Sequence, residues 1–133
     1  MYSLTVTEPL MIAHSLRGDV FGPAQRLHGA AYEVELTLHC QQLSADGIVA
    51  DIGMLSVLLK EILAPWNLQN LDDLADFSRE NSTTEILAFR VHQQTSALIR
   101  QNRFGTDMPR RINEISVLLR ESSRAWAGYR GSL

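Results

Sequence analysis

Apolar and polar residues alternate strictly along residues 31–40, where Tyr32, Val34, Leu36 and Leu38 are separated by polar side chains. A period of two is typical of a strand with one buried face. Residues 4–15, rich in Leu, Val, Thr, Ile and Met, predict an earlier strand with a candidate bulge at Pro9. Residues 111–121 and 125–130 predict two later strands, and residues 48–51 a short extension of the same sheet.

Two other segments show helical spacing. Four apolar residues predict a helix from about Gly53 to Ala64 that Pro65 ends: Leu55, Leu58, Leu59 and Ile62. Ser82 and Glu85 stand at the spacing of a capping box, so a second helix is expected to begin there and to fray near Asn102. The segments between these elements, residues 16–27 and 66–80, predict loops and weak helical turns.

The predicted order is strand, strand, helix, helix, strand, strand. This order favours an α+β fold in one domain, residues 1–133, with a four-stranded antiparallel sheet and two helices on one face. Such a sheet has two open edges, and open edges pair readily with other chains. The pattern therefore predicts a homo-oligomer.

Composition narrows the possible roles of the chain. Twelve Lys and Arg face fifteen Asp and Glu, for a net charge of −3, so no basic excess favours nucleic acid. No apolar stretch approaches the roughly 20 residues of a membrane span, and no signal peptide is evident. The single Cys40 cannot form an intrachain disulfide and is expected to be a small buried hydrophobe. A cytoplasmic location is the expectation.

Five short stretches together resemble one family of enzymes. Residues 13–16 resemble an Ala-His-x-Leu strand, and residues 27–32 a Leu-His-Gly-His-x-Tyr motif. Residues 47–55 resemble Gly-Met-Val-x-Asp-Phe-x-x-Leu, and residues 82–85 the Pro/Ser-Thr-x-Glu start of a helix. Leu119-Arg120-Glu121, followed by Tyr129-Arg130, resembles the strand whose glutamate anchors a pterin. In this order the five stretches resemble the 6-pyruvoyl-tetrahydropterin synthase and 6-carboxy-tetrahydropterin synthase family across nearly the whole chain.

The resemblance implies a fold, an assembly and an activity. The fold is the tunnelling fold, in which three subunits close a β-barrel and two trimers stack into a hexamer. The strands that carry Tyr32, Val34, Ile115 and Val117 would line the contacts between subunits. Family members are lyases that act on dihydroneopterin triphosphate in biopterin or queuosine biosynthesis, and the chain is expected to bind a pterin-like small molecule.

The chain departs from the family at the residues that carry chemistry. Family enzymes hold a catalytic zinc with three histidines, of which His14 and His28 are present, while the third position is Ala30. The family's catalytic cysteine aligns with Ala24, which has no titratable group. His39 lies roughly 35 Å along the strand from His28, and His92 is expected to be a solvated helix residue.

The family's Leu-Asp-His segment aligns with residues 66–68, or with residues 71–73 if a gap is allowed, and neither contains the histidine. The ligand-binding part is retained. Glu121 resembles the carboxylate that accepts two hydrogen bonds from a pterin ring, and Thr83 and Thr84 resemble contacts to the same ring. Trp66 and Trp126 are expected to serve packing or subunit contacts.

Three functions remain open at this level. The favoured hypothesis is a divergent member of the family that binds a pterin or purine-like ring and has lost or replaced the lyase chemistry. The second is an active lyase or aldolase on a reduced pterin that uses other residues in place of the zinc site and the cysteine. The third is an oligomeric scaffold without catalysis. Zinc content tests the metal-dependent form of the second hypothesis, and ligand titration distinguishes the first from the third.

Overall fold

A computed structural model describes all of residues 1–133. The strands are β1 (Tyr2–His14), β2 (His28–Cys40), β3 (Gln69–Asn70), β4 (Ile112–Arg120) and β5 (Trp126–Ser132). The α-helices are α1 (Ile52–Leu63), α2 (Thr84–Arg100) and α3 (Met108–Arg111), and the 3-10 helices are η1 (Asp19–Gln25), η2 (Leu71–Asp73) and η3 (Ala75–Phe77).

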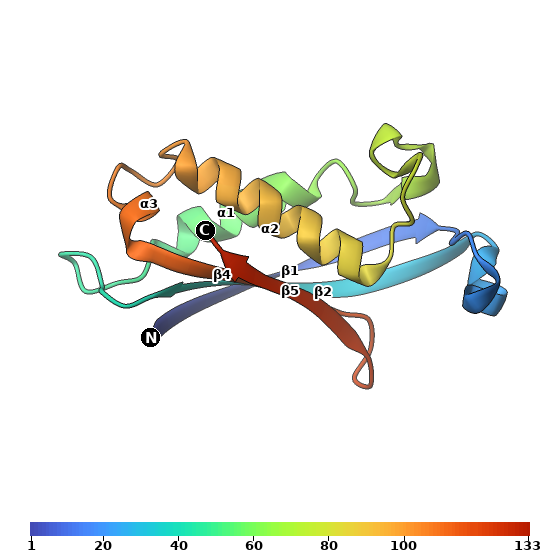
Figure 1. Ribbon diagram of the computed structural model, residues 1–133, viewed down its shortest axis with the longest axis horizontal. Helices are drawn as coiled ribbons and strands as arrows, with labels where there is room; N and C mark the ends of the chain where they lie inside the picture. Colours follow the sequence, from blue (N-terminus) through green and yellow to red (C-terminus); the bar gives the residue numbers. More distant parts are fainter.

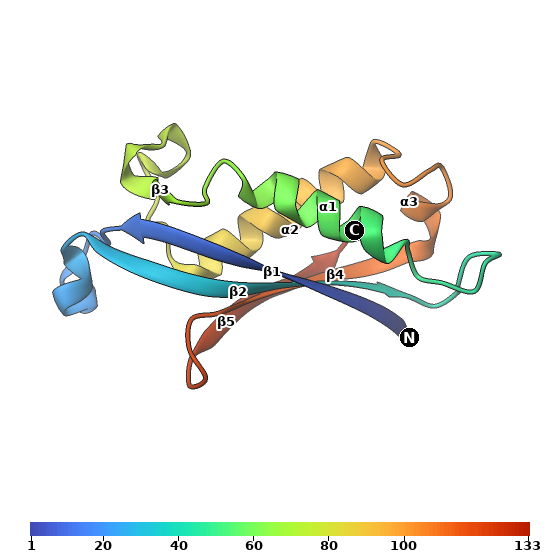
Figure 2. The same cartoon turned by 180° about the vertical axis from the view of Figure 1, so that it is seen from behind.

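The strands form one sheet in the order β3-β1-β2-β4-β5. The four long strands are antiparallel neighbours, and the two-residue β3 pairs in parallel with the end of β1, at Ile12 and Ala13 (Figure 2). The α+β prediction is confirmed, while the predicted four-stranded antiparallel sheet is corrected to five strands in a mixed sheet. The β1–β2 register runs without a shift from Tyr2 opposite Cys40 to His14 opposite His28, so the candidate bulge at Pro9 is wrong.

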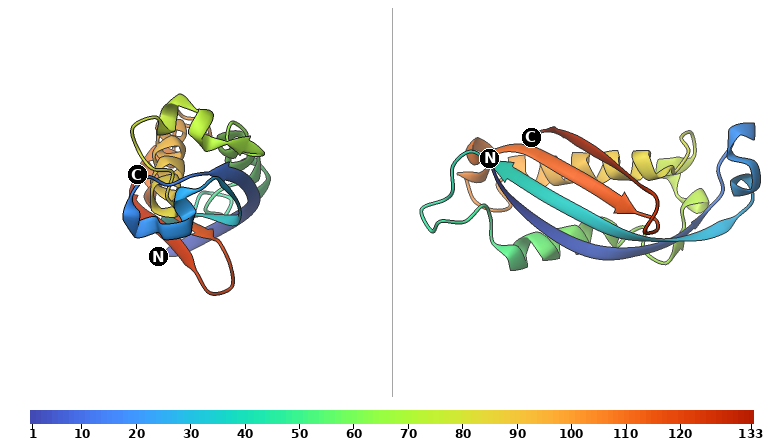
Figure 3. Two further views of the ribbon diagram at one scale, coloured as in Figure 1. Left: turned by 90° about the vertical axis from the view of Figure 1, so that its right-hand side faces the viewer. Right: turned by 90° about the horizontal axis from the view of Figure 1, so that it is seen from below.

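Helices α1 and α2 cover one face of the sheet, and the other face carries no helix (Figures 1 and 3). The apolar positions of the alternating strands face these helices and form the core together with the buried side of α1, as the periodicity predicts. Tyr32, Val34, Ile115 and Val117 belong to this core. Their side chains pack within the chain and are not exposed for contacts with other copies.

Three local predictions are wrong for identifiable reasons. Residues 48–51 form no strand, because Gly47 turns the chain at a φ of 77° and the Asp51 side chain caps α1 by accepting a hydrogen bond from the Met54 N–H. The cap of α2 is Thr83, whose hydroxyl oxygen accepts from the Ile86 N–H, and not Ser82. His92 is buried at 7% exposure beneath β5, with its ring against Tyr129, rather than solvated.

Cys40 is buried and free, as expected. Trp66 packs in the core against Phe77, and Trp126 is exposed at the start of β5 with the Arg120 guanidinium over its ring. None of the helices is both long enough and apolar enough to cross a membrane.

Candidate functional site

One end of the sheet brings together four chain segments that are distant in the sequence. There β1 ends, β2 begins after η1, α2 begins and β4 ends. These segments enclose a cavity of about 260 Å³. Its lining consists of His14, Leu16, Phe21, Ala24, His28, Tyr32, Thr83, Thr84, Glu85 and Glu121. Five positions that the sequence singled out separately, His14, His28, Thr83, Thr84 and Glu121, therefore share one cavity.

One side of the cavity, which we term the binding wall, comprises Thr83, Thr84, Glu85 and Glu121. The Thr83 hydroxyl oxygen accepts the helix-capping hydrogen bond, so its own proton stays available for a bound molecule. Glu121 directly follows β4, where its N–H donates to the Ala125 carbonyl and closes the turn into β5. The binding wall thus presents two carboxylates and two hydroxyls on well-anchored backbone.

The other side, which we term the histidine wall, comprises His14, Leu16, Phe21, Ala24 and His28. His14 and His28 are register partners on β1 and β2, and their rings meet edge-on with centroids 4.6 Å apart. The His14 Nδ1 lies 3.0 Å from the Ser82 carbonyl oxygen and 2.9 Å from the Ser82 hydroxyl oxygen. The His28 Nδ1 lies 2.8 Å from the Arg26 carbonyl oxygen. Backbone oxygens therefore fix the orientation of both rings.

The environment perturbs two titratable groups of the cavity. Burial lowers the pKa of His14, and the neighbouring His28 lowers it further, against the opposing effects of Ser82, Asp72 and Glu121. Burial raises the pKa of the Tyr32 phenol, and the carboxylates of Glu121 and Glu85 raise it as well, while the Thr84 hydroxyl opposes the shift. Both shifts favour the neutral forms of these groups.

The donor set can be tested against the zinc ion that the resemblance implies. A metal-binding histidine usually donates one ring N–H to a backbone or carboxylate oxygen, and His14 and His28 both have such a partner. The third position fails the test, because Ala30 is buried in the apolar core opposite Ile12. No three His, Cys, Asp or Glu side chains gather at a spacing that could hold a metal. The residues present do not match a zinc ion held by three protein ligands.

The resemblance aligns Ala24 with the family's cysteine, and Ala24 lines the cavity. The side chain of Ala24 ends in a methyl group, so this position supplies no thiolate to the cavity.

The two alternatives for the Leu-Asp-His segment lie outside the cavity. Asn67 accepts a hydrogen bond from the Met11 N–H, and Leu68 donates to the Met11 carbonyl. Asp72 accepts hydrogen bonds from the Ser15 N–H and hydroxyl.

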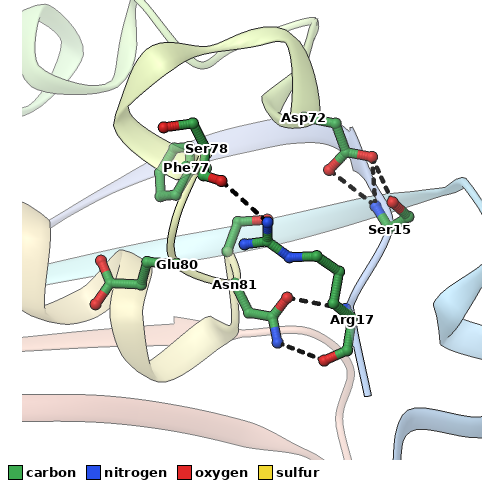
Figure 4. Close-up of a pocket in the computed structure, with 8 residues that line it drawn as sticks. Ser15, Arg17, Asp72, Phe77, Ser78, Glu80 and Asn81 are labelled. Carbon is green, nitrogen blue, oxygen red and sulfur yellow. Dashed lines mark hydrogen bonds between the residues drawn. The ribbon is translucent and has the colours of Figure 1, made fainter. Parts of the chain in front are cut away.

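A second cavity of about 210 Å³ lies beside the first and is almost wholly polar (Figure 4). Asn81 clamps the backbone of Arg17 by accepting from its N–H and donating to its carbonyl, and the Arg17 guanidinium donates to the Ser78 carbonyl. Ser82 lines this second cavity, while His14, which it contacts, lines the first. The two cavities therefore share the Ser82–His14 contact.

Sequence reasoning missed four lining residues of the first cavity. Tyr32 and Glu85 stand inside the quoted motifs, which is the signal that could have identified them. Leu16 likewise ends the first quoted motif, whereas Phe21 lies in a segment that was predicted only as a loop, and no motif marks it. His39 lies at the far end of β2, where it bonds to Ser116, and His92 lies under β5, so neither histidine approaches the cavity.

Comparison with known proteins agrees with this geometry. A family model described as 6-pyruvoyl tetrahydropterin synthase matches residues 3–132. The chain belongs to this family, which confirms the resemblance carried by the five motifs.

Individual relatives are distant but cover the chain. A 6-carboxy-5,6,7,8-tetrahydropterin synthase of Bacillus subtilis is 24% identical over 135 residues, which span 97% of this chain and 86% of that protein. The 6-pyruvoyl tetrahydropterin synthase structure from Caenorhabditis elegans has a TM-score of 0.79 at 19% identity, covering 98% of this chain and 96% of that one. The Plasmodium vivax enzyme has a TM-score of 0.75 at 18% identity, covering 99% and 98%. The structural neighbours establish the fold.

Proposed function

We propose that this protein binds a pterin or a related bicyclic ring in the first cavity, anchored by Glu121 and held by Thr83 and Thr84. The observation that carries the proposal is the convergence of Glu121 with the two threonines in one small cavity, although β4 and the start of α2 are far apart in sequence. A carboxylate suits the ring amide and 2-amino group of a pterin, because two oxygens meet two N–H donors in one plane. The cavity volume, about 260 Å³, is near the lower end of ligand pockets, roughly 300–1,000 Å³, and suits a small ring.

The proposal assigns binding and leaves out the family's zinc-dependent lyase reaction. At the two positions where the resemblance implies the cysteine and the third histidine, the chain has the methyl groups of Ala24 and Ala30. The side chains that remain, His14 and His28, are two imidazoles and do not make a complete metal site. The chain therefore keeps the recognition half of the family's site.

Calorimetric titration with neopterin, biopterin and guanine tests this function. Charge-assisted hydrogen bonds contribute about 1.5–3 kcal/mol each, so Glu121→Ala is expected to weaken binding by at least about tenfold. Glu121→Gln should also bind poorly, because its amide NH₂ would face a ring donor. Glu114→Ala is the matched control, since Glu114 pairs with Arg130 at the other end of β4. Absence of binding at millimolar concentration, or equal binding by Glu121→Ala, would favour the scaffold function instead.

We also propose that the chain forms a trimer or hexamer in which the sheets of three copies close a β-barrel. The outer edge of β1 is paired only at Ile12 and Ala13, and β5 has no partner on its outer side. Unpaired strand edges on both sides of a sheet allow head-to-tail pairing that closes into a ring. Sedimentation equilibrium at micromolar concentration tests this assembly, and a monomer would contradict it.

A further inference from the structure

Two buried polar side-chain atoms of this chain have no hydrogen-bond partner, and both belong to helix α2. They are the Nε2 atom of His92 and the hydroxyl oxygen of Thr95. Thr95 is fully buried at 0% exposure, and His92 is 7% exposed. Buried polar groups in proteins are paired in the large majority of cases, either with protein atoms or with ordered water. Two unpaired atoms on one helix therefore point to a partner that they share.

The two residues are neighbours on the side of α2 that β5 covers. They are three positions apart in the helix, which places them next to each other on its surface. The His92 ring lies edge-on to the Tyr129 ring of β5, with centroids 4.8 Å apart. Phe89, one turn earlier on α2, contacts the same tyrosine ring at 4.9 Å. These contacts fix Tyr129 against the helix and bring its hydroxyl group near the unpaired nitrogen of His92.

Gly131 on β5 marks the space that these polar atoms border. A Cβ atom at this position would lie 3.2 Å from the His92 Nε2 and 3.2 Å from the Tyr129 hydroxyl oxygen. Both polar atoms therefore face one small space, which holds no side chain from β5 because residue 131 is a glycine. A buried water molecule typically makes about three hydrogen bonds to polar groups that would otherwise be unpaired. His92, Thr95 and Tyr129 supply that number of partners.

We propose that α2 and β5 bind one buried water molecule, hydrogen-bonded to the His92 Nε2, the Thr95 hydroxyl and the Tyr129 hydroxyl. Water suits these partners because each of them can donate or accept a hydrogen bond, and water does both. A cation does not suit them, since no group of three metal-ligating side chains gathers here. None of the three residues lines the ring-binding cavity, so this site is independent of the proposed function.

The water site gives the outermost strand a polar link to the helix beneath it. β5 pairs with β4 on one side and has no strand on its other side. Beyond the end of β5, the Leu133 carbonyl accepts a hydrogen bond from the Arg100 guanidinium of α2. The bound water adds a further link to α2 between the Tyr129 ring and this end. It therefore helps to hold in place the free edge of the sheet, where a second copy is proposed to pair.

A high-resolution crystal structure of the whole protein tests the site directly. We expect an ordered water within about 3.2 Å of the His92 Nε2, the Thr95 hydroxyl and the Tyr129 hydroxyl. A Thr95 hydroxyl that instead donates to the Val91 carbonyl, one turn earlier on α2, with no water beside His92, would overturn the proposal.

Urea unfolding tests the site in solution. Thr95→Val replaces the hydroxyl with a methyl group of similar size and should lower the folding equilibrium constant about fivefold, because a hydrogen bond to the water is lost. A hydroxyl without any partner predicts the opposite sign, since its removal stabilises the chain. Tyr129→Phe should be coupled to Thr95→Val, so that the double variant departs at least twofold from the product of the single effects. Tyr2→Phe, at an exposed tyrosine, should combine with Thr95→Val without coupling.

A glycine substitution separates the water from a hydrogen bond within the helix. Gly131→Ala puts a methyl group beside the His92 Nε2 and should displace the water. In that background, Thr95→Val should raise the folding equilibrium constant, because the hydroxyl is then unpaired. Gly29→Ala, at a strand glycine where a Cβ meets no atom closer than 3.8 Å, should leave the effect of Thr95→Val unchanged. A Thr95→Val effect of the same sign and size in both backgrounds would refute the water site.

Discussion

The two walls of the cavity differ in what the family's chemistry would require of them. The binding wall has two carboxylates, two hydroxyls and the start of a helix, at positions that match the family's motifs. The histidine wall has two imidazoles and the methyl group of Ala24, and the third histidine position that the resemblance implies is the buried Ala30. On the proposed function, ring recognition and the family's reaction depend on separate elements of this fold, so a chain can have one without the other.

The largest effect is expected when the histidine wall is given its third ligand. Structural zinc sites bind the ion with a free energy of about 10–16 kcal/mol, which four ligands share. One added ligand is therefore expected to raise the zinc affinity of Ala30→His by roughly a hundredfold. Competition with a chromogenic chelator measures this change. Because Ala30 is buried beside Ile12, the larger side chain should also reduce stability by about 1–3 kcal/mol.

Ala24→His provides the control for that experiment, because it adds an imidazole to the same wall at a position that is only half-buried. It is expected to change zinc affinity less than Ala30→His does. If the unmodified protein retains one zinc per chain after dialysis, the contrast between the walls is wrong and a ligand has been overlooked.

A smaller effect should separate the two roles of Thr83 on the binding wall. Thr83→Ala removes the cap of α2, and Asp51→Ala removes the cap of α1, so each should lower the free energy of unfolding by about 1 kcal/mol. Urea unfolding measures both losses. Only Thr83→Ala should also weaken neopterin binding, because Asp51 lies away from the cavity. Equal affinities of the two variants would limit Thr83 to capping.

The smallest effect concerns Tyr32, which lies between the two walls. Its pKa lies above the ordinary 10.0 because burial and two carboxylates disfavour the phenolate, so the folded chain keeps a proton that the unfolded chain has released. This contributes stability that is fully present below pH 10 and lost as the pH rises further. In a tyrosinate absorbance titration, Tyr32 should ionise above the ordinary range of a phenol. Tyr32→Phe should remove this late phase, whereas Tyr2→Phe, a change at an exposed tyrosine, should leave it in place.

Sequence patterns predicted the parts of the molecule that obey a period or a motif. The alternation from Ala31 to Cys40 and the helical spacing of α1 gave the sheet and its covering helix, since both periods follow from burial of one face. The motifs gave Glu121 and the two threonines. Residues 48–51 were wrongly predicted as a strand because a short apolar run resembles one until the turn at Gly47 and the cap at Asp51 are known.

Long-range packing accounts for the other features that the sequence did not predict. His92 is polar and lies in a helix, yet β5 covers it, and nothing near residue 92 in the sequence indicates this contact. The two-residue β3 is too short to produce a period. Phe21 lines the cavity from η1, which connects β1 to β2, and a loop-like composition does not reveal this placement.

The packing of Ala30 against Ile12 bears on how easily the chain could accommodate a third histidine. A histidine at position 30 must enter a space that the neighbouring strand already fills, so its first consequence is a less stable protein. A smaller residue at position 12 would make room, but by itself it would leave a void beneath β1 and destabilise the chain as well. Each substitution alone is therefore destabilising, and a third histidine is expected to be tolerated best when both positions change together.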